Sequence, residues 1–368
     1  MPIDVAIRSG AFQAFFIFDV ADTIDLTNLV GIAGTDAERA PLRLRSTPSP
    51  GNIQFAVPPV VLPLAPVTIG VRRGESRAKI YDYGVVSIRF SFPFSGSWSD
   101  FADLSGALRR DDAVVAQAGK LLREFLRDYA SALVDPHDTL VEDYYISTIA
   151  EFAGPLSSPA LLTDHSADLV ALLMAEPKPL GPEEQREALR LHFSYFENDL
   201  VVVLWDAAFI YENREDAQVI EDILEFANSQ LVEFRTYDAR LDGELDAIYA
   251  MDVPRMLSRG MTRRRAAERR SEQLGYLLVD IRELADRASN ALKIIGDAYY
   301  ARIYRGIAAR LGLDDWQRQI DSKLDSVGEV YRYLVDQAQT ARSEFLEVIV
   351  IVLIAIEIVV GILGLRHS

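Results

Sequence analysis

The sequence predicts an α+β fold: a largely antiparallel sheet head with helices, followed by long antiparallel coiled-coil helices and a C-terminal transmembrane helix. Up to residue 213, short apolar or alternating runs typical of strands are interleaved with helical periodicity. From residue 214 the strand signal ends, and apolar residues recur at steps of three and four. The run Val348–Leu365 is almost entirely apolar. We therefore expect a cytosolic head at 1–213, a helical stalk at 214–347 and a membrane anchor at 348–365.

The head shows the order of elements that is typical of an α+β domain with a mostly antiparallel sheet. Prolines between residues 46 and 66 exclude a helix there. Asn198 and Asp199 favour a turn between two strands. The predicted elements are a strand at 12–18, a loop or edge strand at 46–66, a strand at 83–92, a helix at 101–133, a strand at 142–149, a helix at 160–174, and a hairpin of strands at 192–196 and 200–212.

Two apolar seams with coiled-coil spacing follow in the stalk. Gly306 and Gly312 lie between them, where a helix would end and turn back, so we expect an antiparallel pair. The alternative is an ordinary helical subdomain folded against the sheet. The first seam contains Ile281, Leu284, Ala288, Ala291, Ile295 and Ala298, and the second contains Ile320, Leu324, Val327, Tyr331, Leu334, Ala338, Ala341, Phe345 and Val348.

The last apolar run has the length of a membrane span. At 1.5 Å per residue, Val348–Leu365 extends roughly 27 Å, close to the hydrocarbon thickness of a bilayer. The first residues of the chain lack the features of a signal peptide, so we expect a tail anchor with the head in the cytosol. Glu357 lies near the middle of the run, where a carboxyl group usually faces another helix. We expect a self-association contact there; the alternative is a tolerated polar residue.

The charge balance and the absence of cysteine exclude several classes of protein. The chain has 368 residues, with 38 Lys and Arg against 55 Asp and Glu, and a formal charge of −17. Such an acidic chain is not expected to coat nucleic acid over its whole surface. Without cysteine, the chain cannot form disulfides, thiolate metal sites or a cysteine nucleophile.

One strongly basic segment interrupts this acidic chain between residues 255 and 270. Three interpretations remain open: a solvated helix face, a surface that binds anionic lipid headgroups, and a site that binds ribosomal or other RNA phosphates. Exposed aromatic residues that would stack on bases are missing from the segment. The candidate lipid- or RNA-binding residues are Arg255, Arg259, Arg263, Arg264, Arg265, Arg269 and Arg270.

Catalytic signatures are absent from the sequence. It contains no glycine-rich phosphate loop, no nucleophile elbow and no paired metal-binding histidines. The residues around His165 are more simply explained as a helix N-terminal cap. A weaker alternative places a divalent ion among carboxylates on neighbouring strands, namely Glu142, Asp143, Glu197, Asp199 and Asp206. We predict no catalytic residue, no metal, no cofactor and no small-molecule substrate.

Several spaced motifs resemble the required-for-meiotic-nuclear-division family of tail-anchored membrane proteins, in its bacterial branch. The quoted stretches are Ser343–Val350 with Leu353, Ile354, Glu357 and Ile358, then Lys323–Asp325 with Val327, Tyr83–Val86, and Asn198–Val202 with Trp205–Ala208. Residues 214–312 match that family poorly. The resemblance implies a domain of unknown function in an oligomeric tether, with no established catalytic residues. It also implies the cytoplasmic (inner) membrane of a bacterium.

The function expected from these observations is a non-enzymatic, membrane-anchored scaffold or tether that forms a homo-oligomer. One alternative is a membrane tether that binds the ribosome or RNA through the arginine cluster 255–270. A less favoured alternative is a metal-dependent hydrolase in the head. The predicted self-association residues are Ile320, Leu324, Val327, Tyr331, Leu334, Ala338, Ala341 and Glu357.

Overall fold

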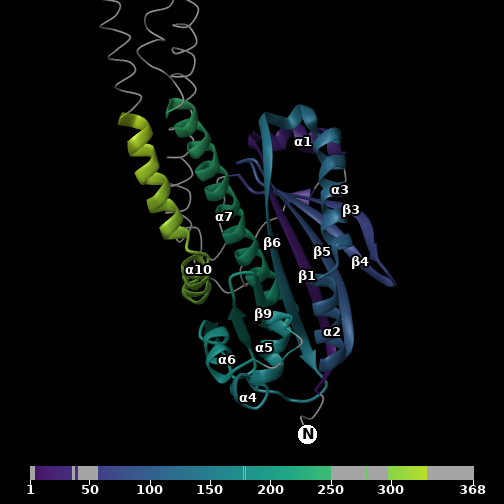
Figure 1. Ribbon diagram of the computed structural model, residues 1–368. Coiled ribbons are helices and arrows are strands. Elements are labelled where there is room, and N and C mark those ends of the chain that lie inside the picture. The colour runs from purple at the N-terminus through teal and green to yellow at the C-terminus, as the bar shows by residue number, and fades with distance from the viewer. Residues whose placement is uncertain are drawn as a thin grey trace, which may run out of the picture. The chain divides into compact units, whose positions relative to one another are not determined.

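The computed structural model describes residues 5–34, 38–39, 57–176, 178, 180–249, 275, 279 and 297–329. The chain forms two compact units. The first comprises Met1–Thr236 with Asp286–Gln317, and the second comprises Tyr237–Ala285 with Arg318–Ser368. Figure 1 shows the elements of the first unit around one large sheet.

The first unit is built on a nine-stranded sheet with the order β2-β3-β4-β5-β1-β6-β9-β8-β7. All neighbouring strands pair antiparallel except β6 and β9, which are parallel. The prediction of an α+β fold with a largely antiparallel sheet is confirmed. The strands are β1 (Ala6–Ile24), β2 (Glu38–Arg39), β3 (Val60–Ile69), β4 (Arg72–Ile80), β5 (Val85–Ser97), β6 (Leu133–Phe152), β7 (His192–Phe193), β8 (Leu200–Val203) and β9 (Ala207–Tyr211).

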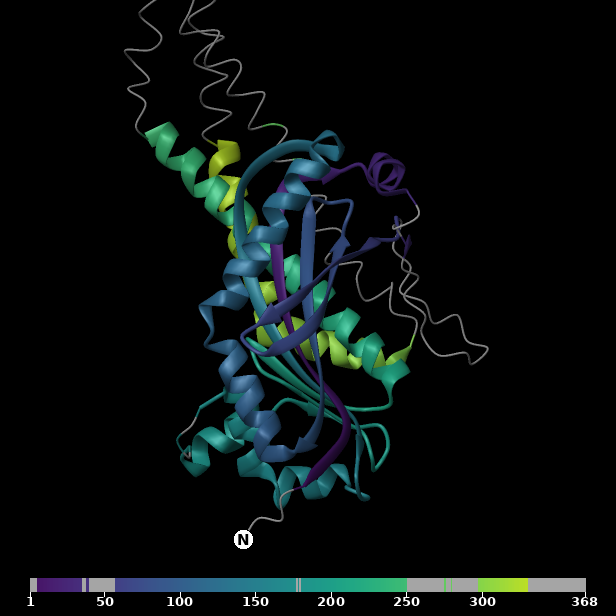
Figure 2. The same ribbon diagram turned by 90° about the vertical axis from the view of Figure 1, so that its right-hand side faces the viewer.

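One face of the sheet carries the apolar core. Residues at every second position of the central strands, such as Phe16 of β1 and Ile88 of β5, are fully buried there. Helices α2 and α3 run along this face (Figure 1, Figure 2). The shorter helical elements of the first unit are α1 (Leu26–Ala33), α2 (Trp98–Arg109), α3 (Asp112–Asp128), the 3-10 turn Ala130–Ala132, α4 (Ser158–Thr163), α5 (Ser166–Met174) and α6 (Pro182–Ala188).

The single helix predicted at 101–133 is two helices in the structure. Ser97 caps α2, where its side chain accepts the Asp100 N–H at 3.1 Å. Asp111 caps α3, where it accepts the Ala113 N–H at 2.9 Å. The break at Asp111 therefore coincides with an acidic cap that periodicity alone does not reveal.

The opposite face of the sheet is covered by the part of α7 (Arg214–Tyr249) that belongs to the first unit, up to Thr236, and α10 (Ala298–Leu311) packs against that part of α7 (Figure 1, Figure 2). Asp297 begins α10 by accepting the Tyr299 N–H at 2.7 Å. Gly312 ends α10 in the left-handed conformation, with φ of 67°. Gly306 instead lies within the helix, where a Cβ atom would come within 2.4 Å of the Phe193 ring. Of the two glycines predicted at a turn, Gly312 ends the helix and Gly306 permits close packing.

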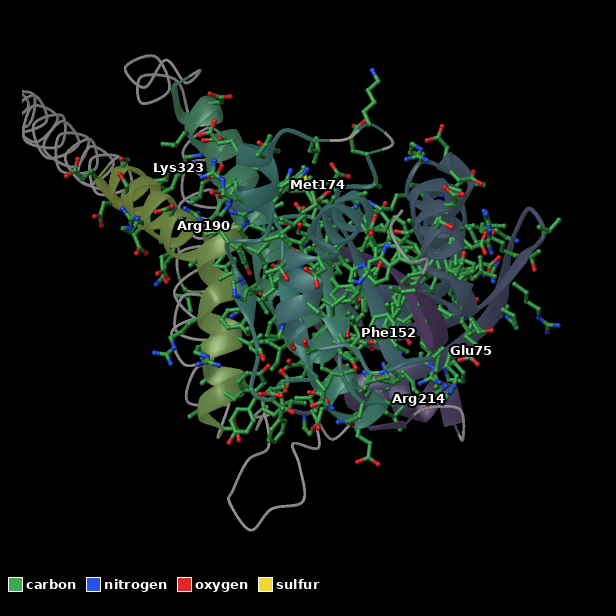
Figure 3. The ribbon with its side chains drawn as sticks, turned by 90° about the horizontal axis from the view of Figure 1, so that it is seen from below. Glu75, Phe152, Met174, Arg190, Arg214 and Lys323 are labelled. Carbon is green, nitrogen blue, oxygen red and sulfur yellow. The ribbon has the colours of Figure 1, made fainter. Side chains whose placement is uncertain are left out.

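The second unit contains the last part of α7, from residue 237, and a helical segment at 318–329. Lys323 (Figure 3) forms ion pairs with Asp238 at 2.7 Å and Asp242 at 2.6 Å. Gln319 donates a hydrogen bond to the Asp238 carboxylate at 3.0 Å. These contacts join the two helical segments within this unit. A long coiled coil is not shown, since the first predicted seam and the second beyond residue 329 lie almost wholly outside the described residues.

The predicted membrane span is not among the helices that the described residues form. The run Val348–Leu365, with Glu357, lies outside the described residues. No helix in the described part of the chain combines the length and the apolar content needed to cross a bilayer. The expectation of a transmembrane, tail-anchored architecture is therefore corrected.

Candidate functional site: the charged layer beneath helix α7

The face of the sheet beneath α7 carries charged and polar side chains in place of a purely apolar surface. Lys79 of β4 and Arg89 of β5 lie on this face, because each alternates with apolar residues that point to the opposite core. Gln13 of β1 and Thr148 of β6 are buried beside them. Four different strands thus supply polar groups to one layer, which we call the charged layer.

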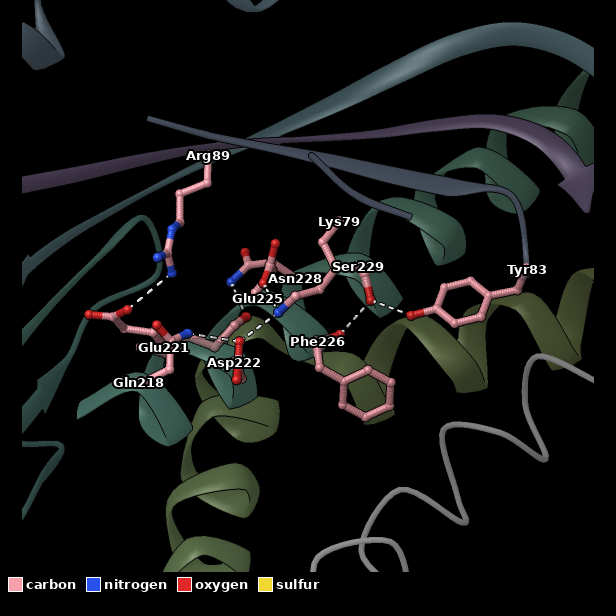
Figure 4. A network of polar contacts seen from close by, with 11 residues as sticks. Lys79, Tyr83, Arg89, Gln218, Glu221, Asp222, Glu225, Phe226, Asn228 and Ser229 are labelled. Atoms are coloured by element: carbon pink, nitrogen blue, oxygen red, sulfur yellow. Dashed lines mark hydrogen bonds and ion pairs between the residues drawn. The ribbon is translucent and has the colours of Figure 1, made fainter. Parts of the chain in front are cut away.

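Helix α7 supplies the carboxylates of the charged layer. Glu221, Asp222 and Glu225 lie within about one helical turn of each other, so they face the sheet together. Lys79 forms ion pairs with Asp222 at 2.5 Å and with Glu225 (Figure 4). Burial alone lowers the pKa of Lys79, but the two carboxylates outweigh it and the pKa is raised. Lys79 is therefore charged and fixed between two residues of α7.

Glu221 is a buried acid of the charged layer, at 4% exposed. Its carboxylate accepts hydrogen bonds from Arg89 at 3.1 Å, Thr148 at 2.9 Å and Gln13 at 2.5 Å. Burial raises the pKa of Glu221, while Arg89 and the two neutral donors act in the opposite direction without cancelling it. The layer thus holds a carboxylate whose charge is costly in its surroundings.

A neutral pair extends the layer toward the end of β4. The Tyr83 hydroxyl lies 2.7 Å from the Ser229 hydroxyl, and Ser229 donates to the Phe226 carbonyl at 2.7 Å (Figure 4). The centres of the Tyr83 and Tyr81 rings lie 5.1 Å apart, with the two planes tilted by 30°. Burial, and then the nearby Glu225, raise the pKa of Tyr81 well above its ordinary value. These contacts fix α7 further along the same face.

The chemistry of the charged layer is that of a structural ion-pair network. The five charged groups comprise two cations and three carboxylates, and each of them contacts a group of opposite charge. Removing one member of such a buried pair leaves an uncompensated charge, whereas the intact network fixes register and orientation. The layer is therefore suited to hold α7 in one position on the sheet.

Two of the carboxylates proposed for a divalent ion are paired with arginines. Glu142 pairs with Arg235, and Asp206 pairs with Arg109 at 2.6 Å. Asp199 accepts the N–H groups of the loop before β8. Within the described ranges, no group of three or more acidic or histidine side chains is arranged to hold a metal ion.

Arg109, at the end of α2, contacts Asp206 and two further segments of the first unit. Its guanidinium lies 4.9 Å from the centre of the Tyr145 ring and donates to the Leu173 carbonyl at 2.5 Å. Burial raises the pKa of its partner Asp206, against the opposing effect of Arg109. The group therefore joins the end of α5 to the turn before β9.

The predicted interaction residues are only partly described. Ile320, Leu324 and Val327 are buried within the single chain, with exposed fractions of 1%, 8% and 0%. Tyr331, Leu334, Ala338, Ala341 and Glu357 lie outside the described residues. The same is true of the whole arginine cluster, Arg255, Arg259, Arg263, Arg264, Arg265, Arg269 and Arg270.

Sequence reasoning missed the charged layer. Its cations and carboxylates lie far apart in the chain, as Lys79 and Glu225 illustrate. The available signals were Lys79 between the apolar Ala78 and Ile80, Arg89 within a largely apolar strand, and the acidic face of a long helix. Inward-pointing charges in strands are an unusual feature that calls for a partner.

A model of the family described as "Uncharacterized protein MJ0711, N-terminal domain" matches residues 9–218, more than half of the chain. Among curated proteins, the chain is similar to "Uncharacterized protein MJ0711" of the archaeon Methanocaldococcus jannaschii. The two are 21% identical over 243 residues, which cover 66% of this chain and 73% of the relative. No solved structure matches the chain.

These matches correct the resemblance to the required-for-meiotic-nuclear-division family, which is wrong. The Tyr83–Val86 motif is explained by local geometry: Gly84 has φ of 90°, and a Cβ atom there would lie 1.7 Å from the Ala21 carbonyl oxygen. The expected inner membrane of a bacterium depends on that resemblance and is corrected with it, since the matched relative is archaeal. The chain belongs to the MJ0711 N-terminal domain family.

Proposed function

We propose that the protein is a non-enzymatic scaffold that self-associates through the helical pair of its second unit. The observation that carries the proposal is the apolar seam on the segment 318–329. This segment is joined to α7 by Lys323, and Ile320, Leu324 and Val327 recur on it at steps of four and three. A seam with this spacing is typical of helices that associate with other helices.

The seam continues in the sequence well beyond the described helix. Tyr331, Leu334, Ala338 and Ala341 maintain the same alternation of three and four. The first positions are buried against the chain itself, so the remaining positions are the ones we assign to a second copy. Alanines at a seam permit close approach of helices.

The charged layer favours the function of a scaffold over that of an enzyme. Its ion pairs are satisfied within the chain, with Lys79 between two carboxylates and Glu221 accepting three hydrogen bonds. A network of this kind contributes a defined position for α7 rather than a reactive group.

Substitution of the continuing seam tests the proposal. Leu334→Asp is expected to dissociate the oligomer, because it places a charge in an apolar helix contact. Leu324→Asp should act in the same direction, although it also disturbs the helical pair within one chain. Ser326→Asp, at an exposed position of the same helix, is the matched control. An unchanged mass of Leu334→Asp by light scattering, with the helical content preserved, would contradict the proposal.

A further inference from the structure

Helix α7 leaves one corner of the sheet beneath it uncovered. The first residue of α7 donates a hydrogen bond to Ser9 of β1 at 2.9 Å, and the helix reaches β4 at Lys79, near the end of that strand. The helix therefore crosses the sheet diagonally, and alternate residues in the first half of β4 are exposed on the face that carries Lys79. We call these residues, Arg73, Glu75 and Arg77, the open corner.

The two arginines of the open corner lack strong counter-charges among the described residues. Arg73 forms no ion pair there, and Arg77 lies 3.6 Å from Glu75. The side chains of that pair are 54% and 74% exposed, so the pair contributes little to stability. In the strand register Arg77 also lies directly opposite Arg89, and like charges in that position repel each other. The open corner is therefore a positive surface in a chain of net charge −17.

The covered part of the same face shows which kind of element its cations bind. Helix α7 brings carboxylates to the sheet, and Lys79 lies between two of them (Figure 4). Arg89, on the next strand, pairs with a third carboxylate of the helix at 3.1 Å. A helix with one acidic face is thus the element that this face of the sheet already binds. The open corner extends the same row of cations along β4 with Arg77 and Arg73.

The helical segment 318–329 of the second unit has such an acidic face. We call its residues Asp321, Asp325 and Glu329 the acidic stripe; they follow each other at steps of four and are all exposed. None of the three forms an ion pair with a described residue. Arg318 lies at the edge of this face, so three negative charges and one positive charge leave it at −2. The apolar seam of the segment is buried, so the seam and the acidic stripe lie on different faces of one helix.

The spacing of the arginines agrees with the spacing of the carboxylates. Arg73 and Arg77 are four residues apart on a strand, which is about 13 Å at 3.3 Å per residue. Asp321 and Glu329 are eight residues apart on a helix, which is about 12 Å at 1.5 Å per residue. A helix that lies along β4 can therefore place one carboxylate against each arginine.

From this geometry we infer that the open corner of one copy of the chain binds the acidic stripe of a second copy. The charges are complementary, the spacings agree, and the same face of the sheet already binds an acidic helix. The inference rests on the proposed self-association and names a contact for it that is separate from the apolar seam.

Two charge-reversal variants of the full chain test the contact. The corner variant carries Arg73→Glu with Arg77→Glu, and the stripe variant carries Asp321→Arg with Glu329→Arg. Each variant is expected to raise the dissociation constant of the oligomer about tenfold or more, because like charges then face each other. Sedimentation velocity measures the dissociation constant, and circular dichroism checks that each variant is folded.

Each variant has a control that makes the same change in net charge elsewhere. Lys120→Glu with Arg123→Glu, on the exposed side of α3, matches the corner variant. Glu183→Arg with Glu184→Arg, in the first turn of α6, matches the stripe variant. Both controls are expected to associate as wild type does, since a general effect of net charge would act on them equally.

A mixture of the two variants tests whether the contact joins two copies. The acidic corner of one variant faces the basic stripe of the other, and the remaining native corner faces the remaining native stripe. The mixture is therefore expected to associate more tightly than either variant alone. A single chain that carries all four substitutions should also recover.

Glu75→Gln should act in the opposite direction to the corner variant. In the proposed contact Glu75 lies between the two arginines and faces the middle of the acidic stripe, where it repels the incoming carboxylates. Its neutral substitute also leaves Arg77 free of its exposed partner. The dissociation constant of the oligomer is expected to fall, and a rise would count against the contact.

The outcomes separate this inference from the proposed function. A corner variant that associates as tightly as its control overturns the inference, and if Leu334→Asp still dissociates the oligomer, the proposed function stands. Recovery in the chain with four substitutions, without recovery in the mixture, places the contact within one copy and overturns the inference. A wild-type mass that falls on ribonuclease treatment assigns the open corner to RNA and also overturns it. A monomeric wild type overturns both proposals.

Discussion

Burial raises the pKa of Glu221, whereas its ion pair with Arg89 lowers it. Its raised pKa means that the folded chain holds this proton more tightly than the unfolded chain, whose Glu pKa is near 4.5. The contribution of this group to stability is thus fully present below pH 4.5 and is lost as the pH rises through the pKa of the folded state.

Glu221→Gln should remove this pH dependence. The amide preserves an acceptor for Arg89 and Thr148 without a charge to desolvate. We expect the free energy of unfolding of the variant, relative to wild type, to increase between pH 4 and pH 7. Urea unfolding followed by circular dichroism at each pH measures it, with the exposed Glu183→Gln as a control. A constant difference across this range would contradict the assignment.

Gly84 is a second residue whose identity is set by its surroundings. Its φ of 90° and the 1.7 Å approach of a Cβ atom to the Ala21 carbonyl oxygen exclude any side chain. Gly84→Ala is expected to destabilise the chain by about 2 kcal/mol or more, since backbone must move. Gly31→Ala, in α1 with open space around it, should be neutral or stabilise by up to about 1 kcal/mol. Thermal unfolding of the two variants gives the comparison, and equal midpoints would be inconsistent with this packing.

Helix α7 and strand β4 depend on each other through Lys79. Lys79→Met leaves Asp222 and Glu225 buried without their cation, which costs about 3–5 kcal/mol for a buried pair. Replacing both carboxylates as well, with Asp222→Leu and Glu225→Met, should restore much of that loss, because an apolar layer is then complete. Lys120→Met, on the exposed face of α3, is the control for urea unfolding. A loss below about 1 kcal/mol in Lys79→Met would show that the pair does not anchor α7.

Sequence patterns predicted the helices and strands better than they predicted the contacts between them. The strands at 12–18 and 142–149 lie within β1 and β6, because long apolar or β-branched runs report burial directly. The strand expected at 200–212 is instead β8 and β9, separated by a turn at 204–206 within a run that is apolar except for Asp206. The pairing of Lys79 with α7 could not be predicted, since it depends on which strand faces which helix rather than on any local pattern.

The two compact units of the molecule carry different structural features. The first holds the sheet and the charged layer, and the second holds the helical pair with the apolar seam. The family match covers residues 9–218 and therefore lies within the sheet-bearing part of the chain and the start of α7. The seam extends beyond that match, so self-association is a proposal for this chain rather than for the family.

Self-association is tested by the mass of the full chain in solution as a function of concentration. Light scattering coupled to size-exclusion chromatography, or equilibrium sedimentation, measures it without any substitution. Self-association predicts a mass that is a multiple of 41.1 kDa and that falls toward this value on dilution. A mass of 41.1 kDa at every concentration would contradict the central claim that the protein self-associates.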